Sequence, residues 1–67
     1  MSSDVQIIVD PCRITYVSRI MEGYEYLGVV TTLDRARGLL VIRTTADSRH
    51  DAIAILKSLP VRVEFVS

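Results

Sequence analysis

Cysteine, tryptophan, asparagine and an excess of either charge are absent or nearly absent from this chain of 67 residues. Cys12 is the only cysteine, so no disulfide can form within the chain. Cys12 and His50 are also the only soft metal ligands, and two such residues far apart in the sequence do not predict a metal site. We therefore expect neither a disulfide scaffold nor a bound metal or other cofactor.

Charge of one sign is missing as well, because eight basic and eight acidic residues give a formal net charge of zero. Non-specific binding to nucleic acid or to an anionic membrane needs a basic excess, so we expect neither partner. No apolar run approaches the roughly 20 residues that span a membrane. The first residues, Met1 to Asp4, lack the basic and apolar regions of a signal peptide. Together with the single free cysteine, these absences predict a cytoplasmic protein.

Hydrophobic side chains are abundant: they make up 49% of the residues, which indicates a globular domain rather than a disordered segment. We expect residues 1–67 to form one domain. A core of this size supplies only about 3–5 kcal/mol of stability, and small domains gain the rest from disulfides, metals or a partner subunit. Because the composition disfavours the first two, we expect a homodimer.

The first third of the chain predicts a strand followed by a helix. Residues 5–9 are rich in β-branched side chains and form a run short enough for a strand. Asp10 is a good N-cap, and Pro11 suits the first helical position, where its missing N–H costs nothing. The helix is expected to end near Glu22, with residues 24–26 as the connection. Its apolar stripe recurs at spacings of three and four residues: Ile14, Val17, Met21 and Tyr24, with Ile20 beside them.

The middle of the chain predicts a β-hairpin. Residues 28–33 form its first strand and residues 39–44 its second. Between them, Asp34 can cap the turn and Gly38 can adopt a positive φ.

A second helix and a last strand complete the chain. Asp47 and Ser48 can cap the helix, and Pro60 ends it. Its buried face is expected to contain Ala52, Ile53, Leu56 and Leu59. Residues 61–65 then alternate as a strand whose inward side chains are Val61, Val63 and Phe65.

The order strand, helix, strand, strand, helix, strand decides the fold class that we expect. It predicts an α+β protein with a ferredoxin-like βαββαβ sandwich. Right-handed crossovers place both helices on one face of a four-stranded antiparallel sheet with spatial strand order 4-1-3-2. The second and fourth strands are then the two edges of the sheet.

These two edges differ in charge. The fourth strand contains Arg62 and Glu64, and such charges protect an edge from pairing with another chain. The second strand has no charge between Leu27 and Leu33, so we expect it to pair with a second copy of the chain. The alternative is that Gly28 and the nearby loop distort this edge and protect it. The residues expected at the dimer edge are Val29, Val30, Thr31 and Thr32.

The sheet face without helices is a second candidate surface. We expect Ile8, Leu39 and Val41 to point outward beside Arg43, which leaves a modest apolar patch. The nearly unbroken apolar run of residues 39–44 does not determine the register of that strand. The patch therefore predicts a partner or ligand surface, or it consists of the scattered aliphatic side chains common on any surface.

Cys12 lies in the first turn of the first expected helix. The helix N-terminus and the neighbouring Arg13 both stabilise a thiolate, so a thiol-based function stays open beside a purely structural cysteine. Heavy-metal-associated domains of this fold carry a metal-binding cysteine pair at this place, and the second cysteine is missing here. Cys12 therefore does not predict metal transfer.

Two other activities found on this fold are not supported by the residues. RNA-recognition motifs place aromatic side chains on the first and third strands, and residues 5–9 and 39–44 contain none. Acylphosphatases use an arginine after the first strand together with an asparagine, and this chain has no asparagine. We therefore expect a protein that is not an enzyme.

The stretch Asp10-Pro11-Cys12-Arg13 resembles the Asp-x-Pro-Gly segment that joins the first strand and helix of the ACT domain, a small-molecule-sensing regulatory module. The glycine of that segment is absent here. The resemblance implies a ferredoxin-like dimer with a ligand near this junction. The runs from Ile20 to Glu25 and from Val30 to Asp34 are also similar to a family of small, uncharacterised bacterial proteins, which implies no activity.

Two hypotheses of function follow. The first is a non-enzymatic, ACT-like regulatory or ligand-sensing homodimer whose ligand contacts Asp10, Cys12 and Arg13. The second is a protein-interaction subunit of a larger complex that uses the second-strand edge or the open sheet face. A ligand without a stable partner favours the first, and a stable partner without a ligand favours the second.

Overall fold

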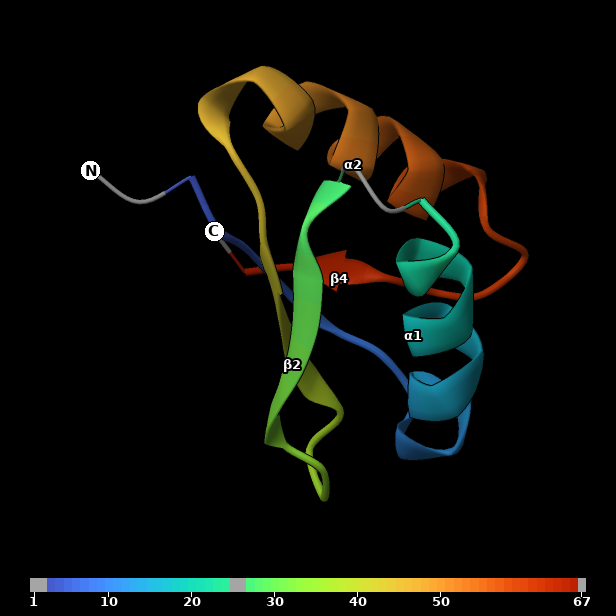
Figure 1. The fold of residues 1–67 in the computed structure, drawn as a ribbon. Coiled ribbons are helices and arrows are strands. Elements are labelled where there is room, and N and C mark those ends of the chain that lie inside the picture. Colours follow the sequence, from blue (N-terminus) through green and yellow to red (C-terminus); the bar gives the residue numbers. More distant parts are fainter. Residues whose placement is uncertain (1–2, 25–26, 67) are drawn as a thin grey trace.

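Four strands, two α-helices and a short 3₁₀-helix follow one another in the described residues, 3–24 and 27–66, of the computed structural model (Figure 1). In chain order they are β1 (Val5–Ile8), η1 (Pro11–Arg13), α1 (Ile14–Glu22), β2 (Val29–Asp34), β3 (Leu39–Arg43), α2 (Ala46–Ser58) and β4 (Glu64–Phe65). The strands and α-helices follow one another in the expected order, and the chain is an α+β protein with a ferredoxin-like fold.

The four strands form one antiparallel sheet in the order β2-β3-β1-β4. Read from the opposite edge, this order is β4-β1-β3-β2, the same set of neighbours that 4-1-3-2 describes. Within the sheet, Ile7 pairs with Leu40, and Ile42 pairs with Val5 on one side and Val30 on the other. The edge strands are therefore β2 and β4.

Both helices pack against the same face of the sheet. Alternate residues of β1 and β3 supply that face, because side chains two positions apart in a strand point to the same side. These residues join the inward faces of α1 and α2 in one buried cluster: Val5, Ile7, Val9, Ile14, Val17, Met21, Leu27, Leu40, Ile42, Ala52 and Leu56. The other face of the sheet carries no helix among the described residues.

The first helix begins where the sequence predicts, but its first turn is a 3₁₀-helix. The Asp10 carboxylate accepts a hydrogen bond from the N–H of Cys12 at 3.0 Å, and Pro11 follows as the first helical residue. Within α1, the buried residues are Ile14, Val17 and Met21. Tyr24, which was expected in the same stripe, is 41% exposed because α1 ends at Glu22 and Tyr24 lies beyond it. Of the expected connection, residues 25 and 26 lie outside the described residues.

The N-cap of α2 is Thr45, and the prediction of Asp47 and Ser48 as the cap was wrong. The Oγ1 of Thr45 accepts a hydrogen bond from the N–H of Ser48 at 3.3 Å. Asp47 lies inside the first turn, where its negative charge suits the positive end of the helix dipole. Threonine and aspartate are both good caps, so composition alone did not separate these two starts. The inward residues of α2 are Ala52 and Leu56, with Ile53, Ile55 and Leu59 half-buried beside them.

The first strand of the hairpin is shifted by one residue relative to the prediction. Gly28 has a φ of 118°, and a Cβ atom there would come within 1.8 Å of the carbonyl oxygen of Arg43, so the regular strand begins at Val29. At the other end, β2 extends to Asp34 through a register shift between Thr32 and Asp34.

The last strand is shorter than expected, since only Glu64–Phe65 pairs with β1 rather than the whole of residues 61–65. Val61 and Val63 are half-buried against the core, as the alternating pattern predicts. Phe65 pairs with the buried Ile7 and so lies on the predicted inward face, but at the sheet edge it stays 37% exposed. A short ladder at the end of the chain leaves this ring beside the core rather than within it.

The uncovered face of the sheet is less apolar at its surface than expected. Val41 pairs with Gln6 on one side and Thr31 on the other, and it is only 3% exposed although it lies outside the main core. Ile8 and Leu39 are half-buried on the same face. The predicted outward orientation is therefore right for these three residues, but Val41 is too buried to belong to an accessible patch.

Candidate functional site

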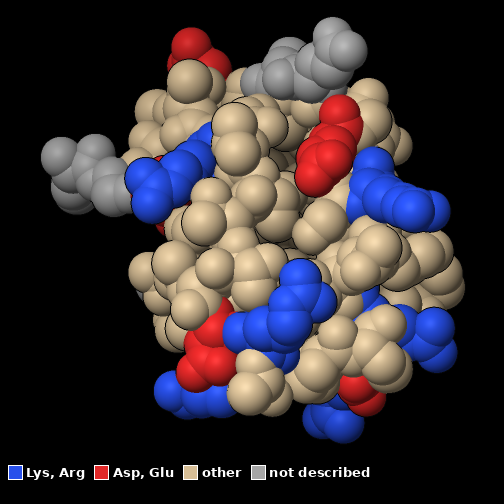
Figure 2. Space-filling model, turned by 60° about the horizontal axis from the view of Figure 1, so that its bottom comes forward, with Lys and Arg blue, Asp and Glu red and all other residues tan. Residues whose placement is uncertain are grey.

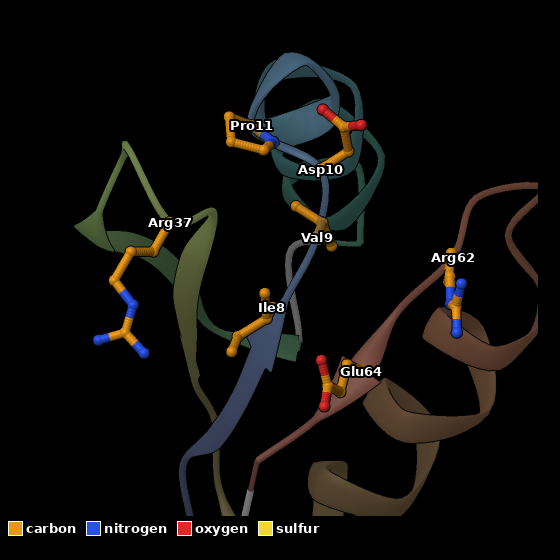
Figure 3. Close-up of a pocket in the computed structure, with 7 residues that line it drawn as sticks. All are labelled: Ile8, Val9, Asp10, Pro11, Arg37, Arg62 and Glu64. Atoms are coloured by element: carbon orange, nitrogen blue, oxygen red, sulfur yellow. The ribbon is translucent and has the colours of Figure 1, made fainter.

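A pocket of about 380 Å³ opens at the end of β1, where the chain turns into η1. Its walls come from three separate segments of the chain, and they are Ile8, Val9, Asp10, Pro11, Arg37, Arg62 and Glu64. Figure 3 shows Arg37 and Arg62 on opposite sides of the pocket, with Ile8 between them. The β2–β3 hairpin supplies one side, and the segment entering β4 supplies the other.

Gly38 holds the hairpin against the end of β1. The N–H of Val9 donates a hydrogen bond to the carbonyl oxygen of Gly38 at 2.9 Å. Gly38 has a φ of 73°, and a Cβ atom at this position would lie 1.7 Å from the carbonyl oxygen of Val9. The turn itself is stabilised by Asp34, whose Oδ1 accepts the N–H of Arg37 at 3.2 Å. These contacts position Arg37 in the pocket wall.

The charged side chains of the pocket have both signs. Arg37 and Arg62 contribute guanidinium groups, while Asp10 and Glu64 contribute carboxylates, so the formal charge of the pocket cancels. The rest of the wall is apolar and comes from the end of β1 and the proline that follows it. Figure 2 shows the same mixture on one face of the molecule, where basic and acidic side chains are scattered between stretches of uncharged surface.

Asp10 and Cys12 form a hydrogen-bonded pair beside the pocket. The Sγ of Cys12 donates to Oδ1 of Asp10 at 3.0 Å. This bond stabilises the protonated thiol and is the main reason that the pKa of Cys12 is raised above its ordinary value. It is also the main cause that lowers the pKa of the Asp10 carboxyl, with the backbone N–H of Cys12 as the second cause. The positive charge of Arg13 lowers the pKa of Cys12 by less, so this environment disfavours a thiolate.

The three residues predicted to contact a ligand are close in sequence but have different positions. Asp10 lies in the pocket wall. Cys12 is exposed and contacts Asp10 without lining the pocket. Arg13 is also exposed outside the pocket, and its backbone N–H donates to the carbonyl oxygen of Asp10 at 2.7 Å.

Arg37, Arg62 and Glu64 were not predicted as pocket residues. Arg62 and Glu64 were interpreted as charges that protect an edge strand, and Arg37 was not assigned to any site. The expected strand order already contained the missing signal, because antiparallel neighbours of β1 bring the hairpin turn and the start of β4 to its end. That geometry depends on the lengths of the strands and turns, which the residue pattern does not give.

The four residues predicted at the dimer edge all lie in β2, but their environments differ. Val29 is 62% exposed, and Thr32 is also exposed. Thr31 is half-buried, and Val30 is half-buried where it packs against the core. Leu33, next along the strand, is 49% exposed.

The part of the chain that the structure describes has neither a metal-ion cluster nor a membrane-spanning helix. No group of three or more histidine, cysteine, aspartate or glutamate side chains could hold a metal ion there. Neither of the helices found there is long and apolar enough to cross a membrane. The pocket and the β2 edge are therefore the features on which a function can be argued.

Fold and pocket together define a small ferredoxin-like α+β domain with a mixed-charge pocket at the end of β1. The family described as "Domain of unknown function (DUF4911)" matches residues 7–63, and the chain belongs to this family. This membership supports the predicted similarity to a family of small uncharacterised proteins. No curated protein and no solved structure matches the chain.

Proposed function

We propose that the chain is a non-enzymatic, ACT-like regulatory module that binds a small ligand, works as a homodimer and acts in the cytoplasm. The observation that carries the proposal is the pocket at the end of β1, which lies beside the segment that resembles the ACT domain. Its volume of about 380 Å³ falls within the roughly 300–1,000 Å³ usual for small-molecule sites.

The chemistry of the pocket favours a ligand that carries both charges and a short apolar part. The guanidinium groups of Arg37 and Arg62 suit a carboxylate, and the carboxylates of Asp10 and Glu64 suit an ammonium group. The apolar wall around Ile8 provides surface for a small side chain. An α-amino acid combines these three parts, so we propose amino acids as the ligand class.

Thermal unfolding in the presence of candidate ligands tests the proposal. Leucine should raise the midpoint of unfolding by several degrees at saturation, because a ligand at 100 times its Kd adds about 2.7 kcal/mol to a small folded domain. Isoamylamine lacks the carboxylate and 4-methylpentanoate lacks the ammonium group, so both should shift the midpoint less. If no compound among the amino acids, nucleotides and small organic acids shifts the midpoint, the sensing function is wrong.

Variants of the pocket arginines provide the matched control. Arg62→Gln and Arg37→Gln should each abolish most of the shift produced by a binding amino acid. Arg35→Gln changes the same hairpin at a residue outside the pocket wall and should leave the shift intact. Equal losses in all three variants would mean that the ligand does not bind in this pocket.

A protein-interaction subunit is the second candidate function. It is favoured by the exposure of Val29 and Leu33 on β2 and of Val66 at the end of the chain. A pull-down from a native extract separates the two functions, since a stable partner with no thermal shift from any ligand supports the interaction subunit.

A further inference from the structure

The outer edge of β2 has unpaired backbone groups. In the antiparallel ladder, hydrogen-bonded and non-hydrogen-bonded pairs alternate, and the bond from Val9 to Gly38 sets the phase of this alternation. Counting across β3, the backbone groups of Thr31 point toward β3, whereas those of Val30 and Thr32 point away from the sheet. No strand of the described residues lies beyond β2.

The side chains along this edge do not protect it. Between Val29 and Leu33 there is no charge, and both of these end residues are largely exposed, at 62% and 49%. The opposite edge strand, β4, contains only Glu64 and Phe65, with the charge of Arg62 just before it. Short length and charge are the usual means by which an edge avoids pairing, and residues 29–33 of β2 have neither.

We propose that β2 pairs antiparallel with β2 of a second copy of this chain, with the two-fold axis at Thr31. In this register each Val30 exchanges backbone hydrogen bonds with Thr32 of the second copy, which are the residues whose groups point outward. Each Val29 lies opposite Leu33 of the second copy, so the two exposed aliphatic side chains cover each other. The four strands of each copy then form one continuous sheet.

Charge at the ends of β2 agrees with this orientation. Asp34 ends the strand, and Arg43 pairs with Val29 at its start. Antiparallel pairing brings the acidic end of one β2 toward the basic start of the other, at both ends of the interface. Parallel pairing would place each of these charges beside its own kind.

The distortions of β2 lie at the two ends of the proposed contact rather than at its centre. The positive φ belongs to Gly28, before the first paired residue, and the register shift follows Thr32. The central residues, 29–32, therefore keep a regular ladder that a second strand can extend. A second copy is favoured over β4 of a neighbour because β4 pairs over only two residues.

Residue 31 faces itself across the proposed axis, which gives a direct test by sedimentation or light scattering. The unmodified chain should have twice its 7.5 kDa mass. Thr31→Lys and Thr31→Glu each place like charges directly opposite one another, so each variant alone should dimerise roughly fivefold more weakly. An equimolar mixture of the two should recover the dimer as a Lys–Glu pair. Thr15→Lys, on the exposed surface of α1, is the control and should leave the mass unchanged.

The inference extends the homodimer of the proposed function and is judged separately from it. A dimer that both Thr31 variants leave intact overturns the β2 register but keeps a dimer formed through another surface. A monomer at all concentrations overturns both. Amino-acid binding is measured by thermal shift in every variant, so a failure of the pocket proposal appears independently of mass. Circular dichroism shows whether the two Thr31 variants are folded when alone. If one of them is not, recovery of the dimer in the equimolar mixture is the result that tests the register.

Discussion

Gly38 and Val9 approach so closely that no side chain fits between them. The carbonyl oxygen of Val9 would lie 1.7 Å from a Cβ atom on Gly38, and the N–H of Val9 bonds to the carbonyl oxygen of Gly38. This contact joins the β2–β3 turn to the strand that leads into the pocket. The position of Arg37 therefore depends on the neighbouring glycine.

Replacement of this glycine should be costly. In Gly38→Ala, the positive φ alone costs about 1–3 kcal/mol, and the backbone contact with Val9 adds to it. We expect a loss of at least about 2 kcal/mol in the free energy of unfolding, measured with urea, together with weaker amino-acid binding. Gly23→Ala is the control, because Gly23 has a helical φ of −65° and should change stability by less than about 1 kcal/mol. Similar effects of the two substitutions would mean that the turn is not held as described.

The thiol of Cys12 should react slowly at neutral pH. Its hydrogen bond to Asp10 raises the pKa of the thiol, so the rate of reaction with a thiol reagent should rise with pH around a midpoint above that of a free cysteine. Asp10→Asn keeps an N-cap acceptor but removes the negative charge, and it should lower this midpoint and speed the reaction at neutral pH. Asp47→Asn, in the distant α2, should leave the profile unchanged. A fast reaction of the unmodified chain at neutral pH would instead favour a thiol-based function.

Two substitutions at the start of α2 distinguish its cap from its first turn. Thr45→Ala removes the Oγ1 that accepts the N–H of Ser48 and should cost about 1 kcal/mol of stability. Asp47→Ala loses only a favourable interaction with the helix dipole and should cost less, about 0.3–1 kcal/mol. Chemical denaturation measures both losses of stability. A larger loss in Asp47→Ala than in Thr45→Ala would mean that Asp47 is the N-cap.

A single truncation in the core should unfold much of the protein. Leu56 is 1% exposed, and replacing such a leucine by alanine costs about 2–5 kcal/mol. A core of this size supplies only about 3–5 kcal/mol, so Leu56→Ala should leave little stability. Its circular dichroism should depend on protein concentration if dimer formation supplies the remainder. Lys57→Ala, next to it on the exposed side of α2, should retain the native signal.

The sequence predicted helices and strands well where the local residue pattern allowed only one interpretation. Asp10 with Pro11 predicted the helix start because few residues suit those two positions, and Ile14, Val17 and Met21 predicted the buried face of α1. The start of α2 was misplaced because Thr45 and Asp47 are both good caps. The difference between them depends on the path of the chain leaving β3, which is a tertiary property.

The pocket was less predictable than the fold. Asp10 was predicted near a ligand, but Arg37 and Arg62 are 25 residues apart in the sequence and neither was assigned to a ligand site. The two arginines line the same pocket only because β1 pairs with β3 on one side and with β4 on the other. The spacing of residues in the sequence does not predict that these side chains meet, because their meeting depends on the registers of the β1–β3 and β1–β4 pairs.

If the pocket binds the proposed ligand, its construction from three distant segments links the supply of that ligand to the amount of folded protein. In the unfolded chain, the parts around Asp10, Arg37 and Arg62 are separate, so a ligand of this pocket binds the folded form alone. At 100 times its Kd such a ligand adds about 2.7 kcal/mol, which is comparable to what so small a core provides. Proteolysis acts on the unfolded fraction, so scarcity of the ligand would shorten the life of the protein itself.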